Sequence, residues 1–224
     1  MKILVWDLPT RAFHWLLAVS FTGASLTAES ERLRDVHVSF GYMMLGLIAL
    51  RILWGVLGTR YARFASFAFG PRRVFAYLGS ILCGRPEHHV GHNPAAGWVI
   101  YVLLSLGAAA GISGGLTYNE FGAEWLAETH DALANAMLGV VVIHLSGVIA
   151  SSLIHRENLP RSMLDGRKRG RTSQAIRAPR TAVAVALAAA VLAFWIGQAA
   201  DPVAAMPAAA RIAAHYEHNE QHEH

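Results

Sequence analysis

The sequence predicts an all-α integral membrane protein, with an antiparallel four-helix transmembrane bundle and a fifth transmembrane helix at the C-terminal side. Only 15% of the 224 residues are charged and 54% are hydrophobic, whereas soluble domains carry about a quarter charged residues. Five apolar stretches approach the ~20 residues that a membrane-spanning helix needs. The basic residues gather in segments that flank these stretches, which is typical of membrane topology.

The five predicted spans are, in chain order, 9–28, 33–57, 95–117, 129–153 and 181–200. The first is the most polar, and we expect it to pack inside the bundle; its polar residues are Ser20, Thr22, Ser25 and Thr27. Because the connections at about 29–32 and 118–128 are short, the helices that they join should be antiparallel.

The spans divide the chain into four predicted parts. Residues 1–165 form the transmembrane bundle, 166–180 a basic cytoplasmic linker, 181–200 the fifth helix and 201–224 a histidine-rich periplasmic tail. Met1 and Lys2 precede only a short apolar patch, so we expect no cleavable signal peptide.

The basic residues predict the orientation. Fifteen of the nineteen Lys and Arg residues lie on one side of the predicted bundle, and the opposite side holds only Arg32, Arg34 and Arg211. The positive-inside rule then places the N-terminus in the cytoplasm and the C-terminus in the periplasm of a bacterial inner membrane. The net charge of +4 is therefore explained by topology, and no nucleic-acid partner is expected.

Four histidines occupy the predicted spans, where ionisable residues are costly and usually functional. His14 lies in the first span, His37 in the second, and His130 and His144 in the fourth. The latter two are fourteen residues apart, so they share one helical face and lie ~21 Å apart along the axis.

Depth in the membrane pairs these histidines. With the predicted orientation, His37 and His130 lie near the outer surface, whereas His14 and His144 lie nearer the cytoplasm. Two imidazoles are typical axial ligands of a haem iron that transfers electrons. The pattern therefore predicts two bis-histidine haems b rather than four unrelated histidines. Cys83 is the single cysteine, so the C-x-x-C-H motif of covalent haem attachment is excluded.

Arg51 is a further candidate for cofactor binding. It lies fourteen residues after His37, on the same helical face and near the predicted inner haem. Its guanidinium could bind a haem propionate or a quinone oxygen, or it could be an interfacial arginine that reaches out to water. His92 and Asn93 could line a quinone pocket or cap the third span. Five glycines could admit a porphyrin face or allow close helix packing: Gly41, Gly46, Gly107, Gly111 and Gly139.

Several motifs resemble the bacterial cytochrome b561 family, which is related to the b-type cytochrome subunits of Ni/Fe-hydrogenases. The resemblance covers about residues 3–170. It rests on the two histidines fourteen residues apart and on WDLPTRAFHW at 6–15, VHVSFGY at 36–42, RILWG at 51–55, RYARFASF at 60–67 and GHNP at 91–94.

The resemblance implies a four-helix core with two haems on His14, His37, His130 and His144. It also implies electron exchange between membrane quinone and a partner, either a periplasmic c-type cytochrome or an enzyme subunit. The fifth helix and the tail depart from the minimal family pattern, and the oligomeric state is left open.

Alternative functions remain at this stage. The chain could anchor a hydrogenase-like oxidoreductase, or act itself as a superoxide:quinone oxidoreductase, so whether it is an enzyme is left open. A different class is a transporter that binds metal ions, without haem, through its histidines. The tail could also bind a metal through His215, His218, His222 and His224.

Overall fold

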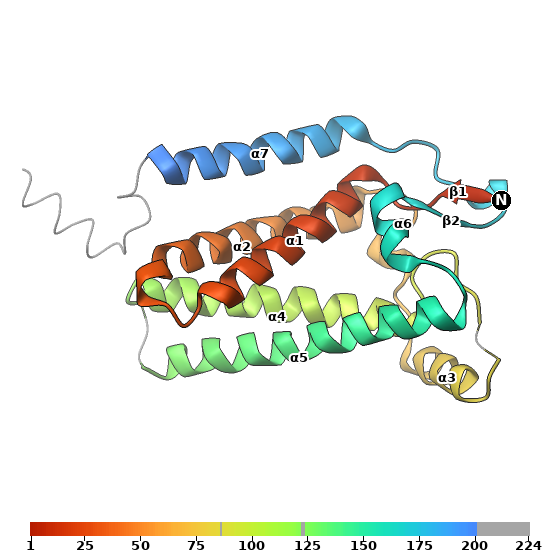
Figure 1. Cartoon of the computed structure of the whole chain (residues 1–224), viewed down its shortest axis with the longest axis horizontal. Coiled ribbons are helices and arrows are strands. Elements are labelled where there is room, and N and C mark those ends of the chain that lie inside the picture. Colours follow the sequence, from red (N-terminus) through yellow and green to blue (C-terminus); the bar gives the residue numbers. More distant parts are fainter. Residues whose placement is uncertain (86, 122–123, 201–224) are drawn as a thin grey trace, which may run out of the picture.

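The computed structural model describes residues 1–85, 87–121 and 124–200. The histidine-rich tail lies outside these residues. Five long helices dominate the fold (Figure 1), namely α1 (Leu8–Thr27), α2 (Arg34–Leu57), α4 (Pro94–Tyr118), α5 (Glu124–Ile154) and α7 (Thr181–Ala200). The predicted bounds agree with these to within one residue, except that α5 begins five residues before the predicted span.

The shorter elements lie near the ends of the long helices. They are the helices α3 (Pro71–Leu82) and α6 (Leu159–Asp165), the strands β1 (Lys2–Leu4) and β2 (Arg167–Arg169), and the 3-10 turns η1 (Glu31–Leu33), η2 (Phe64–Ser66) and η3 (Thr172–Gln174). We call the end of the bundle with β1 and β2 the inner end, and the end where α1 joins α2 and α4 joins α5 the outer end (Figure 1).

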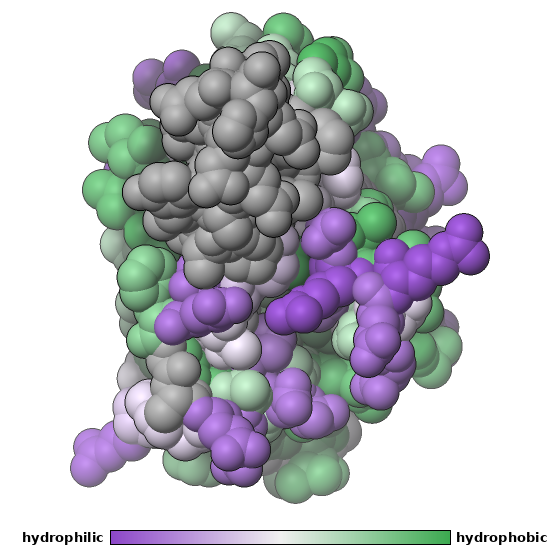
Figure 2. Space-filling model, turned by 90° about the vertical axis from the view of Figure 1, so that its left-hand side faces the viewer, coloured by the Kyte–Doolittle hydropathy of each residue, from purple (hydrophilic) through white to green (hydrophobic). Residues whose placement is uncertain are grey.

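Four helices of the described chain are long and apolar enough to cross a membrane: Glu31–Leu57, α4, α5 and α7. The helix α1 has 20 residues but is not among them, in keeping with its polar residues. It packs along α2, and α7 packs on the outside of α1 and α2. Figure 2 shows hydrophilic residues gathered on the outer end and hydrophobic residues along the sides, as a bundle with lipid around it requires.

Side-chain caps fix where α1 and α4 begin. The Asp7 carboxylate accepts a hydrogen bond from the Thr10 N–H at 2.8 Å, and the Asn93 side chain accepts one from the Ala96 N–H at 2.8 Å. A proline stands in the first turn of each helix, where its missing N–H costs nothing. Asn93 is therefore the capping residue of α4, which leaves the neighbouring His92 for another role.

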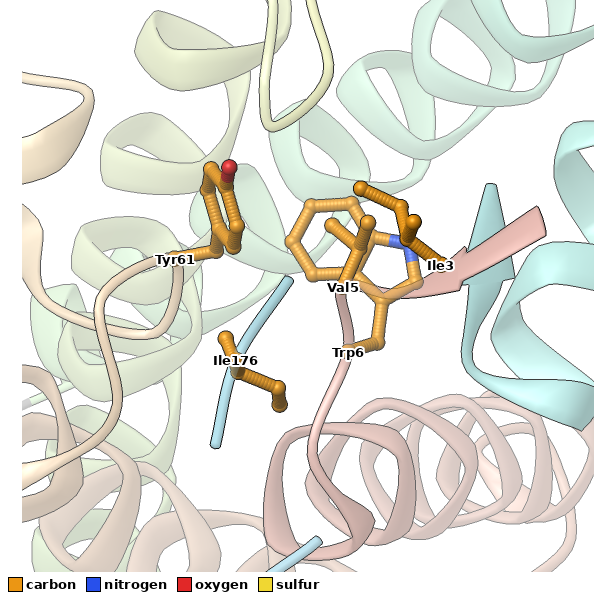
Figure 3. Packing of buried hydrophobic residues seen from close by; sticks show 5 residues of the cluster. All are labelled: Ile3, Val5, Trp6, Tyr61 and Ile176. Atoms are coloured by element: carbon orange, nitrogen blue, oxygen red, sulfur yellow. The ribbon is translucent and has the colours of Figure 1, made fainter. Parts of the chain in front are cut away.

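The basic segment after α6 folds back onto the N-terminus. The strand β2 pairs antiparallel with β1, with Ile3 opposite Lys168. The N–H groups of Val5 and Trp6 donate to the Gly166 carbonyl. Figure 3 shows the apolar cluster that this brings together, formed by Ile3, Val5, Trp6, Tyr61 and Ile176. The residues that we expected to form a linker thus form part of a folded cap on the inner end.

A buried ion pair supports this cap. Lys168 is 6% exposed, and its Nζ lies 3.6 Å from a Glu157 carboxylate oxygen while donating a hydrogen bond to the His89 carbonyl at 3.1 Å. Burial lowers the pKa of Lys168, and Glu157 opposes that shift. Since removing one partner of a buried pair leaves the other uncompensated, this contact holds the loop before α4 against β2.

Candidate functional site

The structure brings the four histidines of the bundle together as two pairs. The rings of His14 on α1 and His144 on α5 have centroids 6.4 Å apart, with an angle of 55° between their planes. The rings of His37 on α2 and His130 on α5 have centroids 6.1 Å apart, at 89°. These are the pairs that depth and helical face predict. All four side chains are partly buried.

Helix packing explains why the rings face one another. Close contacts run from α1 to α2, from α2 to α4 and from α4 to α5, whereas α5 makes few contacts with α1 or α2. The two histidines of α5 therefore project across a part of the bundle where the helix backbones do not meet.

Backbone carbonyls orient the outer pair. His37 Nδ1 lies 2.9 Å from the Ala24 carbonyl oxygen, and His130 Nδ1 lies 2.9 Å from the Ala110 carbonyl oxygen. In each ring Nδ1 then donates, which leaves the Nε2 lone pair free for a metal. In the inner pair, His14 Nδ1 is buried without a hydrogen-bond partner.

The spacing of both pairs suits a metal held between two imidazoles. A transition metal lies about 2 Å from a ligating imidazole nitrogen, so two axial rings on one ion have centres about 6 Å apart. The observed separations of 6.4 and 6.1 Å agree with this value. The chemistry of these donors fits a haem iron.

Arg51 is buried and does not reach out to water. Its side chain is 6% exposed. One guanidinium nitrogen, Nη2, donates to the Ala62 carbonyl at 3.1 Å, and the guanidinium carbon lies 5.1 Å from the centre of the Phe64 ring. The other, Nη1, is buried with no hydrogen-bond partner. An unsatisfied buried donor costs roughly 1–3 kcal/mol, and more when it is charged, so this geometry favours a bound ligand over an interfacial arginine.

His92 lies close to this arginine and to the inner histidine pair. Its ring stands between Trp6 and Phe67, with centroid distances of 4.6 Å to each. Burial, followed by the charges of Arg51 and Lys168, lowers the pKa of His92 to about 3. His92 is therefore neutral at neutral pH, and its buried Nδ1 has no hydrogen-bond partner.

The glycines of the spans divide into two groups. A methyl group on Gly107 would approach Ile48 to 2.9 Å, and one on Gly111 would touch Leu45, so these two glycines allow α4 to pack against α2. By contrast, a methyl group on Gly41, Gly46 or Gly139 would meet no atom within 4 Å. Gly41 lies one turn from His37 on the same helical face, where it leaves space beside the outer pair.

Comparison with known proteins decides the family. A sequence model described as prokaryotic cytochrome b561 matches residues 5–166, which include all four histidines, Arg51 and His92. The chain belongs to the prokaryotic cytochrome b561 family. As a b-type cytochrome of this family it binds haem b, and with four helices able to cross a membrane it is a multi-pass membrane protein.

Two curated relatives of this chain share one name. The probable Ni/Fe-hydrogenase B-type cytochrome subunit of Rhizobium leguminosarum bv. viciae is 23% identical over 130 residues, which cover 47% of this chain and 54% of the relative. The protein of the same name from Rhodobacter capsulatus is 21% identical over 218 residues, covering 75% and 81%. This cytochrome b561 chain thus spans about half the length of the first relative. No solved structure matches it.

The aromatic surroundings of the inner site were not predicted from the sequence. Trp6, Phe64 and Phe67 all belong to the motifs at 6–15 and 60–67, and they lie around Arg51 and His92. The sequence does show these aromatic residues, in the segments that flank α1 and α2. It carried no distance information, because these contacts join segments far apart in the chain.

Proposed function

We propose that this cytochrome b561 protein holds two haems b, each between two histidines, and carries electrons across the membrane between quinone and a redox partner at the outer end. His37 and His130 ligate the outer haem, and His14 and His144 ligate the inner haem. Haem supplies one-electron redox chemistry. The chain supplies the axial imidazoles, sets the depth of each group in the membrane and shields both groups from water.

The single observation that carries this proposal is that each of the two histidines of α5 faces a histidine of another helix. Both have the separation that a shared metal requires, and fourteen residues of helix set them ~21 Å apart along the axis. Two sites at different depths serve transfer across a hydrocarbon core of ~30 Å. Bis-histidine ligation leaves no open position for a substrate at iron, which favours electron transfer over catalysis at the metal.

The orientation follows from charge. Fifteen of the nineteen Lys and Arg residues belong to the inner end, so we place this end and the N-terminus in the cytoplasm, and α1 then spans the membrane with the other helices. Both curated relatives are named as subunits of a Ni/Fe-hydrogenase. These names favour a redox enzyme as the outer partner, and a periplasmic c-type cytochrome is the other candidate.

Quinol reduction of the purified protein tests the proposed function. The full-length protein should be red, with the sharp reduced bands of low-spin haem b, and an added quinol should reduce both haems under anaerobic conditions. A colourless protein would favour the metal transporter. Haems that dithionite reduces but quinol does not would remove quinone from the proposal.

Removal of the C-terminal helix should leave both haems in place. A chain that ends after Arg180 lacks α7, which packs on the outside of α1 and α2 and carries none of the four proposed ligands. We expect two haems per inserted chain, and a lower melting temperature because Phe13 and Leu47 lose their contact with Leu187. The haem-to-protein ratio of the truncated protein checks this. A ratio near zero would mean that α7 is needed to form the sites.

Gly114→Ala should weaken the outer site. A methyl group at this position would lie 2.7 Å from His130 Cε1, and the ring cannot move away without losing its hydrogen bond to Ala110. Loss of such an orienting contact typically costs 10–100-fold in metal affinity, so we expect the haem content to fall from two toward one per chain. Gly139→Ala is the matched control on α5, since a methyl group there meets no atom. Equal haem contents in the two variants would contradict the assignment of His130.

A further inference from the structure

The strongest unexplained feature of the inner end is a set of buried donors that no protein group satisfies. Arg51 Nη1, His92 Nδ1 and Trp6 Nε1 are all buried without a hydrogen-bond partner. They come from α2, from the loop before α4 and from the segment before α1, and the rings of Trp6 and His92 are in contact. Buried polar atoms are nearly always paired in folded proteins, so these three unpaired atoms favour a bound ligand.

The nearby carboxylate does not pair with Arg51. Asp7 is 1% exposed, but one of its oxygens accepts the Thr10 N–H at 2.8 Å and the other accepts the Thr59 hydroxyl at 2.6 Å. Both oxygens of Asp7 therefore have partners other than Arg51. The guanidinium therefore keeps one free edge, and its charge favours an anion with acceptor oxygens.

Aromatic side chains surround Arg51, which is buried, and His92, which is half-buried. The Phe64 ring covers the guanidinium of Arg51, and the Phe64 carbonyl accepts the Tyr101 hydroxyl at 3.1 Å. The rings of Trp6 and Phe67 both contact the ring of His92. These contacts hold both side chains in place, which suits a group that stays bound.

We propose that Arg51 and His92, with Trp6 beside them, bind a propionate carboxylate of the inner haem. Arg51 lies at the depth of His14 and His144, because fourteen residues of α2 separate it from His37. The carboxylate accepts hydrogen bonds from Arg51 Nη1, from neutral His92 through Nδ1, and from the indole N–H of Trp6. This assignment rests on the proposed function, and it makes Arg51 and His92 positioning residues for the haem rather than quinone ligands.

The test is a redox titration of both haems in quinone-free, full-length protein. Arg51→Leu should keep two haems per chain. It should change the ratio of oxidised to reduced inner haem about tenfold in favour of the oxidised form, which lowers the potential by about 59 mV for a one-electron couple. The sign follows because a nearby positive charge favours the reduced iron. His92→Phe keeps the ring between Trp6 and Phe67 and should shift the inner haem in the same direction by a smaller factor. The outer haem should not move in either variant.

The matched control is Arg63→Leu, which removes an exposed charge from the loop after α2, also at the inner end. Because water screens this charge, both haem potentials should stay unchanged. If the Arg51→Leu protein does not insert into the membrane, the potential of the inner haem in His92→Phe tests the proposal by itself. If the potential of the inner haem is the same in both variants as in the wild type, the proposal is overturned. If the variants also lose reactivity with quinol without that shift, Arg51 and His92 bind quinone instead. A wild-type protein with fewer than two haems overturns the proposed function itself.

Discussion

Replacement of His37 by alanine is expected to leave one haem per chain and to abolish electron exchange with the outer partner. The imidazole of His37 faces that of His130 with a centroid separation of 6.1 Å, and a methyl side chain cannot ligate iron. The inner pair lies ~21 Å deeper along the helix axis, so the inner haem should still form. Haem content, a low-spin spectrum and reduction by a membrane-impermeant donor measure the three parts of this expectation.

His88→Ala is the control for the loss of a histidine as such, because His88 is an exposed loop residue. This variant should keep both haems and normal exchange. If His37→Ala retained two haems with unchanged spectra, His37 would be no ligand, and the outer site would have to be built from other residues.

Replacement of His144 by alanine should remove the inner haem and stop reduction by quinol, while the outer haem remains. His144 faces His14 at 6.4 Å, and both lie at the end of the bundle where we place the quinone reaction. The outer haem should still accept electrons from the impermeant donor, so the two variants have opposite patterns of reactivity. Stopped-flow reduction by quinol and by the donor, measured in both proteins, distinguishes them.

The matched control for this variant is His155→Ala. His155 follows the last residue of α5, Ile154, and its ring faces the exposed His88 rather than a histidine of the bundle. It should react with quinol as the wild type does. Quinol reduction of the remaining haem in His144→Ala at the wild-type rate would contradict the assignment of the inner haem to the quinone side.

The long helices and the histidine pairs could be predicted because their signals are local or periodic. Apolar length predicts the helices, and the spacing of fourteen residues fixes the shared face of His130 and His144 whatever surrounds α5. The predicted direction of each helix through the membrane then gives the depth of each histidine. Matching depths are enough to predict both histidine pairs.

The inner cap could not be predicted in this way. The pairing of β1 with β2 joins residues 2–4 to residues 167–169, and the basic composition of the second segment suggests solvent. Lys168 is buried because its ammonium forms an ion pair with Glu157 and donates a hydrogen bond to the His89 carbonyl. Likewise, the burial of Arg51 depends on the segment at 60–67 folding over it, which no periodicity in α2 reveals.

The measurement that most directly tests two haems on two histidine pairs is the haem-to-protein ratio of the fully loaded full-length protein, combined with its electron paramagnetic resonance spectrum. Two non-covalent haems b per chain, both with the low-spin signals of bis-histidine ligation, are the predicted result. One haem per chain, or a second haem with a high-spin signal from an open axial position, would contradict the account.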